Sequence, residues 1–496
     1  MPAHQPLIDF YENDFSSTLF PLDTNRLLVT QHTEAVANFV YQEILISGTH
    51  QFLPQMRVYA SKPGFHVRRT VKLDPVAEFF VYDIIFRNRA TFRRDFNPSR
   101  RNFGYLFANG GVVSSGESHR HFKMQVVQAS QQFNYWAKFD ISSYFNSVYH
   151  HDLVTWFRED ANRTNDDIEA FGKFFREINA GRSLDCLPQG ITPCKMIGSH
   201  FLKYVDNSAR LQSELLLRFM DDFYLFSNNE RAVIEDFTLI QRLLGDKGLS
   251  INPMKTKIGQ VAVADIRRNV DAIRGRLLQR RNDIVEASGV EETEETTDEE
   301  AQSILSQAEV EYLLDLLRNN DIEEEDAELV LALMRDHSSD IVGYLEDFLV
   351  RFPNLSRQIY YFCRYIDDTN DLRVILSRLL SQPNYLSEYQ LFWMAKIVQD
   401  YLLLTPQVGE VIIGLLDHPN ASQISKAKLL EIPERRFGLP EVRLEHIRTG
   451  SSDWLAWAAA MGSRAESRAG RNHLLGYFQN SSPMNKLIAD FVIGLP

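Results

Sequence analysis

The chain of 496 residues contains only three cysteines, Cys186, Cys194 and Cys363, and none of them lies in a CxxC or Cys/His spacing. This scarcity argues against a disulfide scaffold and against a zinc ribbon. No apolar run approaches the roughly 18 residues that cross a bilayer, and the first residues carry acids where a signal peptide is basic. We therefore expect a soluble, cytoplasmic protein without membrane contact, with two to four domains of roughly 100–200 residues.

Excess negative charge is absent from most of the chain, although the net charge is −13. Residues 286–328 hold 17 acids and a single arginine, a balance of −16, which leaves +3 for the remainder. Residues 57–101 hold 11 Lys and Arg against four acids. Such a basic segment is suited to face nucleic-acid phosphates, because Lys and Arg displace the counterions of the backbone. A solvated surface with scattered charge is the alternative.

Hydrophobic patterning divides the chain into two halves. Before about residue 260, short apolar runs typical of strands, such as 79–86 and 215–227, mix with helical stretches and favour an α+β fold. From about residue 302, successive amphipathic segments of 10–16 residues predict an all-α half. Their spacing suggests stacked helical pairs of a HEAT-like kind, and an irregular bundle is the alternative because no strict repeat is visible.

A region of strongly biased charge separates the two halves. It contains an arginine-rich stretch (267–282) at mostly helical spacing and an acidic segment (286–300) without aromatic residues. We expect the acidic segment to be a linker, because like charges repel and few apolar groups are present to form a core. The expected domains are therefore residues 1–260, 261–301 and 302–496.

Three Asp-Asp pairs occur, at 166–167, 221–222 and 367–368. The middle pair is preceded and followed directly by apolar residues, as in a β-hairpin whose tight turn presents two carboxylates. Asp140 ends another strand-like run and supplies a third carboxylate. Carboxylate oxygens are ligands that Mg²⁺ prefers, and two ions roughly 3.5–4 Å apart can serve phosphoryl transfer.

Four motifs, in order, resemble those of reverse transcriptases. Residues 139–145 (FDISSYF) are similar to the family's motif A, and residues 187–190 (LPQG) reproduce its next landmark. Residues 219–222 (FMDD) are similar to motif C, and residues 248–256 (GLSINPMKT) to motif D. The resemblance implies an α+β right-hand polymerase, with fingers and palm of reverse-transcriptase type, followed by the all-α HEAT-like domain.

The resemblance also implies a role for the residues of these motifs. Asp140, Asp221 and Asp222 would hold two Mg²⁺ ions, for which Mn²⁺ is a possible substitute. Phe145 would exclude a 2′-hydroxyl by crowding and so select deoxynucleotides. Gln189 would lie against the nucleotide or the primer end.

Cationic candidates come from motif D and from the fingers. Lys255 would supply positive charge or a proton to the pyrophosphate leaving group. Residues 68–75 (RRTVKLDP) alternate as a fingers strand does, and Arg68, Arg69 and Lys72 are candidates to clamp the triphosphate. Either arginine could face the nucleotide, because successive strand residues point to opposite faces. For each of the three, an ordinary surface charge is the alternative.

Two further segments are placed by their position relative to the palm. The arginine-rich stretch 267–282 follows it where a polymerase thumb begins, so a thumb-like helix along phosphates is expected, with a solvated basic face as the alternative. Tyr365-Ile366-Asp367-Asp368 is nominally a better match to the usual Tyr-x-Asp-Asp, but it lies in the helical half. We expect its acids to cap a helix.

A reverse-transcriptase palm is followed here by a helical half, and three segments add to this pattern: 73–83 (LDPVAEFFVYD), 451–462 (SSDWLAWAAAMG) and 471–478 (RNHLLGYF). In these features, across nearly its whole length, the chain resembles the bacterial abortive-infection group of antiphage reverse transcriptases, often carried on prophages. That resemblance implies a homo-oligomer that builds single-stranded DNA from dNTPs, without a template and attached to one of its own tyrosines. Tyr11 and Tyr41 are candidates because the N-terminal segment precedes the fingers. Two alternatives are a templated polymerase of retron or intron type, with an RNA or DNA template, and a non-catalytic nucleic-acid-binding palm. Phe219, where the family usually has tyrosine, leaves templated synthesis open.

Overall fold

The computed structural model describes residues 4–94, 97–108, 110–159, 163–184, 187–261, 305–318, 322–382 and 385–496, together with Ile273, Arg276, Leu277 and Arg280. The expected thumb-like stretch lies almost entirely outside these residues, and the acidic segment 286–300 lies wholly outside them. The domain boundaries around 261 and 301 therefore stay predictions. Among the described residues, no helix is both long and apolar enough to cross a bilayer.

Four N-terminal helical segments and a β-hairpin form the fingers. The helical segments are α1 (Gln5–Phe15), α2 (Asp23–Gln31), α3 (Thr33–Asn38) and the π-helix η1 (Phe39–Ile46). Strands β1 (Met56–Ser61) and β2 (Val67–Lys72) pair in an antiparallel hairpin. The fingers strand expected within 68–75 is thus confirmed, and it ends before Asp74.

Helix α4 (Pro75–Arg87) is the centre of the fingers core. Asp74 caps its start by accepting hydrogen bonds from the N–H groups of Val76 and Ala77, and Pro75 suits its first turn. It contacts α1, α2 and α3 together with α8 (Asn165–Ile178) and α9 (Thr192–Phe201). The strand expected at 79–86 is therefore wrong: the helix is buried all round, so its apolar residues show no helical period.

The palm is a five-stranded sheet in the order β3-β7-β8-β6-β9. Its strands are β3 (Arg100–Asn102), β6 (Tyr135–Asp140), β7 (Leu215–Phe219), β8 (Asp222–Ser227) and β9 (Lys257–Gln260). The β3–β7 pair is parallel and the other pairs are antiparallel. The run 215–227 is therefore a hairpin of two strands, as expected.

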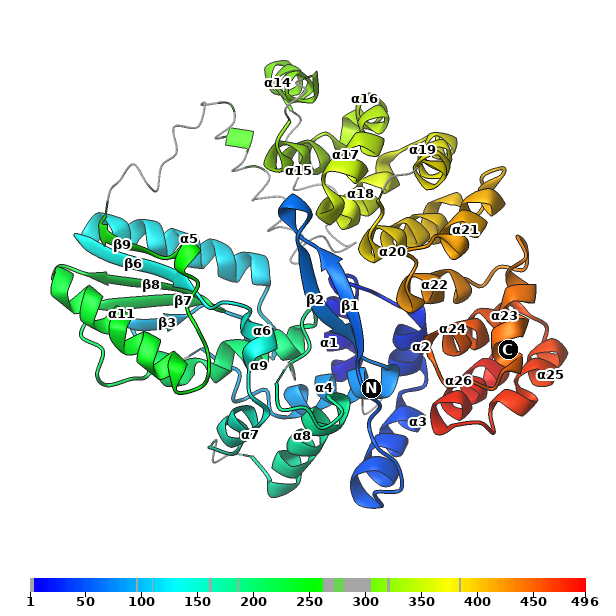
Figure 1. The fold of residues 1–496 in the computed structure, drawn as a ribbon, viewed down its shortest axis with the longest axis horizontal. Helices are drawn as coiled ribbons and strands as arrows, with labels where there is room; N and C mark the ends of the chain where they lie inside the picture. Colours follow the sequence, from blue (N-terminus) through cyan, green and yellow to red (C-terminus); the bar gives the residue numbers. More distant parts are fainter. Residues whose placement is uncertain are drawn as a thin grey trace.

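Two helices cover the palm sheet on opposite faces (Figure 1). On one face, Phe122 of α5 (Ser115–Gln132) packs in one buried cluster with Trp136 and Tyr224. On the other, Phe237 of α11 (Glu230–Gly245) packs against Phe139, with ring centroids 5.1 Å apart. The alternation of side chains along β6 and β8 produces both apolar faces.

The C-terminal half is helical throughout its described residues. Its α-helices are α14 (Gln307–Arg318), α15 (Glu324–Leu333), α16 (Ser338–Ile341), α17 (Leu345–Arg351), α18 (Ser356–Phe362), α19 (Thr369–Ser381), α20 (Glu388–Ile397), α21 (Val408–Asp417), α22 (Gln423–Leu430), α23 (Leu439–Arg448), α24 (Trp454–Gly462), α25 (Arg468–Phe478) and α26 (Pro483–Gly494). Short 3-10 and π segments, such as η6 (Pro353–Leu355), connect several of them.

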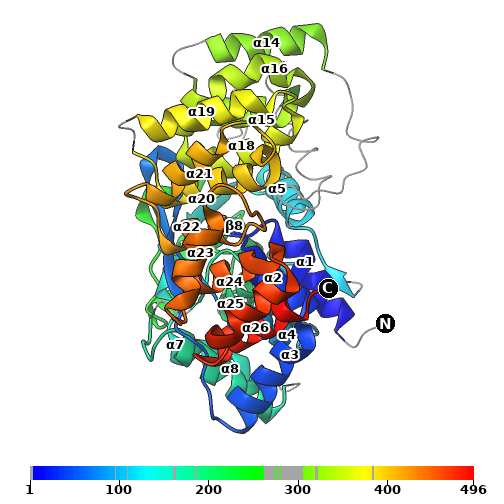
Figure 2. The ribbon, with the colours of Figure 1, turned by 90° about the vertical axis from the view of Figure 1, so that its right-hand side faces the viewer.

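These helices stack in rows. Helices α18, α20, α22, α24 and α26 contact one another in succession, and a second row holds α17, α19 and α21. The stack runs from α14 to α26, which ends beside the N-terminal helices (Figure 2). The all-α prediction is confirmed for the described residues, whereas the HEAT-like assignment remains a prediction.

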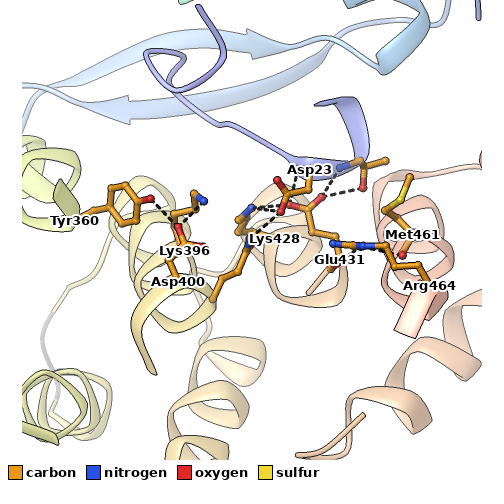
Figure 3. Close-up of polar contacts among 10 residues, drawn as sticks. Asp23, Tyr360, Lys396, Asp400, Lys428, Glu431, Met461 and Arg464 are labelled. Atoms are coloured by element: carbon orange, nitrogen blue, oxygen red, sulfur yellow. Dashed lines mark hydrogen bonds and ion pairs between the residues drawn. The ribbon is translucent and has the colours of Figure 1, made fainter. Parts of the chain in front are cut away.

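A buried charge cluster joins the helical half to the fingers (Figure 3). The Glu431 carboxylate accepts hydrogen bonds from the backbone N–H groups of Asp23 and Thr24, at 2.9 and 2.8 Å. The ammonium of Lys428 lies 2.8 Å from Glu431 and 3.3 Å from Asp23. Lys428 and Glu431 are completely buried and Asp23 is nearly so, and the lysine supplies the positive charge that both acids need in this site.

Candidate active site

The register of the palm sheet brings Asp140 and Asp222 together. The two residues are direct partners across the β6–β8 pair, so their side chains lie on the same face of the sheet. Asp221 occupies the turn of the β7–β8 hairpin, next to Met220, whose φ of 54° is left-handed. The predicted hairpin with two carboxylates at its turn is therefore the one that the chain forms.

Arg218 fixes the backbone of this turn through buried hydrogen bonds. Its guanidinium is fully buried, and it donates from Nε to Oδ1 of Asp206 and from Nη1 to the carbonyl of Met220, both at 2.8 Å. Asp206 ends the short helix α10 (Lys203–Asp206). Sequence analysis missed Arg218, although a cation inside an apolar strand requires a buried partner and thereby signals one.

The carboxylates repel each other. Burial, followed by the charge of Asp222, raises the pKa of Asp221 to about 6. Burial and then the charge of Asp140 raise the pKa of Asp222 as well. Both shifts mean that the ionised forms lack sufficient cationic compensation from the protein, so a bound cation would stabilise the site.

The donor set suits Mg²⁺. Oδ1 of Asp140 is buried and accepts no hydrogen bond from the described residues, which leaves a hard oxygen ligand available. Within that part of the chain, no group of three or more His, Cys, Asp and Glu side chains is placed to hold a metal ion by itself, so ligands from outside the protein would be needed. Mg²⁺ in polymerase sites is commonly bound by one or two carboxylates plus substrate phosphates and water, which this arrangement fits.

Lys255 completes the charged cluster. Its ammonium lies 2.8 Å from Oδ2 of Asp140. The motif D segment is fixed to the end of β6, because Asn252 N–H donates to the carbonyl of Asp140 at 2.9 Å and Ile251 forms a bridge with Ile141. The hydrogen bond to Asp140 is the main cause of the raised pKa of Lys255.

Phe145 lies in α6, the short helix that follows Asp140 and the end of β6. Ser143, with φ of 49°, turns the chain out of β6 into α6 (Tyr144–Ser147). Phe145 is 8% exposed and packs beside Gly198 of α9. A Cβ at Gly198 would lie 3.5 Å from the Phe145 ring, an ordinary van der Waals distance, and 3.3 Å from the Tyr144 ring, so both aromatic rings of α6 pack against this point of α9.

Gln189 is tied to the fingers strand through its backbone. The Thr70 hydroxyl donates to the Gln189 carbonyl at 2.5 Å, and Gly190 follows with φ of 111°. Thr192, at the start of α9, donates its N–H to the Asp14 carboxylate at 2.6 Å. The motif that the sequence predicted as a nucleotide contact is therefore held by both β2 and the N-terminal segment.

The three fingers cations occupy different environments. Arg68 shares the face of β2 that carries Thr70, whereas Arg69 lies on the opposite, exposed face. Nε of Arg68 is buried and donates no hydrogen bond among the described residues. Lys72 does not fit the expected role: its ammonium is buried in the fingers core and paired with Glu78. Of the two arginines, Arg68 is thus the one on the side of β2 that contacts the Gln189 turn.

Sequence analysis also missed Lys62. This residue begins the turn of the fingers hairpin, where its N–H donates to the carbonyl of His66 at 2.8 Å. Burial lowers the pKa of Lys62, and the positive charges of Arg68 and Lys255 lower it further, while Asp221 and Asp140 act in the opposite direction. Lys62 therefore lies within electrostatic reach of Arg68 and Lys255 as well as of two of the carboxylates.

Neither candidate priming tyrosine presents a free hydroxyl. Tyr11 is buried and donates to Glu78 at 2.8 Å. Tyr41 donates to Asp83, and burial raises its pKa well above the ordinary value. The expectation for Asp368 is confirmed: its carboxylate caps α19 by accepting from Asn370 N–H at 2.9 Å.

Comparison with known proteins identifies the palm. Residues 106–313 match the family model described as "Reverse transcriptase (RNA-dependent DNA polymerase)". This match includes Asp140, the LPQG turn and the Asp221–Asp222 hairpin, so the palm is of reverse-transcriptase type, whereas the fingers helices α1–α4 and the β1–β2 hairpin precede the matched residues. No curated protein matches the chain.

Two solved structures show a distant similarity. Apo telomerase from Candida tropicalis has 12% identity and a TM-score of 0.32, covering 78% of this chain and 74% of that one. Telomerase from Candida albicans in complex with a TWJ fragment of telomeric RNA has 12% identity and the same TM-score of 0.32, covering 81% and 68%.

Proposed function

We propose that this chain is a DNA polymerase that adds deoxynucleotides to a 3′-hydroxyl. The observation that carries the proposal is the register pair Asp140–Asp222 with Asp221 at the adjoining turn, inside a palm that matches the reverse transcriptase family. Raised pKa values of Asp221 and Asp222 support a role in cation binding. A purely structural palm would have no need for three acids at one strand end.

Each residue then has a chemical task. Asp140, Asp221 and Asp222 would bind two Mg²⁺ ions, or Mn²⁺ in their place, which supply the charge that activates the attacking hydroxyl and stabilises the leaving pyrophosphate. Lys62, Arg68 and Lys255 orient the triphosphate by charge. The Phe145 ring occupies the space that a 2′-hydroxyl needs.

We further propose the antiphage role that the resemblance implies, with synthesis that needs no template and begins on the protein. Because Tyr11 and Tyr41 are engaged, a priming tyrosine would be an exposed one, such as Tyr385 or Tyr477. Labelled dNTP should then give a band that stays with the protein through boiling in detergent. Scattering measurements on the same preparation should give the mass of a homo-oligomer.

One experiment tests the activity and its alternatives. Purified protein is incubated with dNTPs and Mg²⁺, with and without an added RNA or DNA template, and the products are sequenced. Random products without template support the proposal, complementary products that need the template support the retron or intron type, and no product supports a binding scaffold.

Matched variants test the site itself. Asp221→Asn should abolish incorporation while the protein stays folded, since it removes charge at a turn and leaves no cavity. Asp367→Asn changes the Asp-Asp pair of residues 365–368 (YIDD), which resembles motif C in sequence but lies in the helical half. This variant should retain wild-type incorporation. Incorporation by the Asp221→Asn variant would show that the palm hairpin is not the active site. Loss of incorporation by a folded Asp367→Asn variant would show the same.

A further inference from the structure

In the described structure, the outer edge of the fingers hairpin pairs with no further strand, and the helical half packs against it. A two-stranded hairpin is marginally stable in water by itself, and an edge strand leaves backbone N–H groups without strand partners. Strand β1 is such an edge, because it pairs only with β2 in this sheet of the described structure. Figure 1 shows the hairpin between the palm and the helical half, with α20 beside it.

Two side chains at the start of α20 make this contact. The Glu388 carboxylate accepts a hydrogen bond from the Tyr59 N–H of β1. The hydroxyls of Ser387 and Ser61 lie 3.0 Å apart. Ser387 is itself fixed as the cap of α20, where it forms a reciprocal capping box with Gln390. The α20 start is therefore a rigid support for the outer edge of β1.

The same helical layer also reaches the base of the second strand. Helix α22, which contacts α20, is followed by Glu431, and its carboxylate holds the first N–H groups of α2 (Figure 3). From α2, the Asn25 amide donates to the carbonyl of Leu73 at 2.9 Å, directly after β2. Both strands of the hairpin are thus connected to the α20–α22 pair.

The position of the hairpin matters for the proposed site, because β2 carries side chains that contact the Gln189 turn or are proposed to bind the triphosphate. Thr70 bonds the Gln189 carbonyl, and Arg68 extends from the same face of the strand. We propose that Glu388 is a positioning residue through which the helical half holds the fingers hairpin, and with it Arg68 and Gln189, in place for nucleotide binding. This inference rests on the proposed polymerase function.

Three full-length variants test it. Glu388→Ala removes the acceptor for Tyr59 N–H, and Glu388→Gln keeps a carbonyl acceptor at the same place. Glu346→Ala is the matched control, because Glu346 is also half-buried and bonded, but its partners Arg378 and Gln382 lie within the helical half. Amide hydrogen exchange of residues 56–72 and steady-state kinetics with dNTP are measured for each.

We expect faster exchange in residues 56–72 of Glu388→Ala by about tenfold, as for one or two lost hydrogen bonds. KM for dNTP should rise by a similar factor with kcat changed much less, and Glu388→Gln should restore both. Unchanged exchange at 56–72, or equal changes in Glu346→Ala, would overturn the inference. The exchange measurement needs no catalysis, so it still decides the question if the wild-type protein proves to lack polymerase activity.

Discussion

The ammonium of Lys255 lies 2.8 Å from Oδ2 of Asp140, while Oδ1 of the same carboxylate is buried and accepts no hydrogen bond within the described part of the chain. One oxygen is thus neutralised by the protein and the other remains available. The arrangement separates two tasks on one side chain, because a cation on Oδ1 need not displace the lysine from Oδ2. Lys255 itself is mostly exposed, so it can also move toward a phosphate.

Lys255→Ala should slow incorporation by about 10²-fold, the scale at which a positioned acid or cation contributes to catalysis. Lys255→Arg keeps the charge but cannot release a proton at neutral pH. Recovery in the Arg variant therefore indicates a purely electrostatic role, and a persistent loss indicates proton transfer. Single-turnover rates measure both. An unchanged single-turnover rate in Lys255→Ala would show that Lys255 takes no part in catalysis.

Phe145→Val should admit ribonucleotides, because the smaller side chain vacates the volume beside Gly198. The ratio of dNTP to rNTP incorporation should fall by about 10- to 200-fold, the range by which an apolar pocket discriminates a single methylene-sized group. Phe145→Tyr keeps the ring and should keep the preference. If the Val variant is active, folded and still selective, sugar selection lies with another residue.

Much of the palm is predictable from local sequence. Asp140 and the 221–222 pair each end or interrupt a short apolar run, and the structure places them at adjoining strand ends. Alternation along 68–75 likewise predicts β2. The prediction of a strand at 79–86 is wrong, because a helix that is buried on every side lacks the apolar periodicity that distinguishes a helix from a strand.

The partners that side chains find in the folded protein were beyond such reasoning. Nothing local indicates that Lys72 pairs with Glu78 in the core rather than with a ligand. Nor does any pattern indicate that Glu388 meets Tyr59, since the two are 329 positions apart. The first contact depends on how β2 packs against α4, and the second on how the helical half packs against the fingers; both are properties of the whole fold.

Lys428→Met tests the buried cluster of Figure 3. Removal of the ammonium leaves Asp23 and Glu431 buried without their common cation, so stability should fall by about 3–5 kcal/mol. Lys486→Met is the control, because its pair with Asp490 is exposed and should be worth at most about 1 kcal/mol. Urea unfolding of both variants gives the comparison. Similar midpoints would mean that the cluster adds no stability.

Asp74 makes stability depend on pH. Its carboxylate caps α4 but is buried, and burial outweighs the two hydrogen bonds, raising its pKa from 3.8 to about 6. The folded state therefore holds the proton more tightly than the unfolded state does. This contribution to stability is present below about pH 4 and is lost as the pH rises through about 6.

Asp74→Asn isolates this effect, because the amide oxygen can still cap α4 and carries no charge. At pH 7 the Asn variant should be more stable than the wild type by up to about 3 kcal/mol, the equivalent of the shift in the pKa of Asp74. Near pH 4 the difference should be small. Asp74→Ala, which loses the cap, should be less stable than the Asn variant by about 1 kcal/mol at both pH values. Thermal unfolding across pH 4–8 measures all three proteins, and a wild-type-to-Asn difference that does not change with pH would show that Asp74 ionises freely in the folded protein.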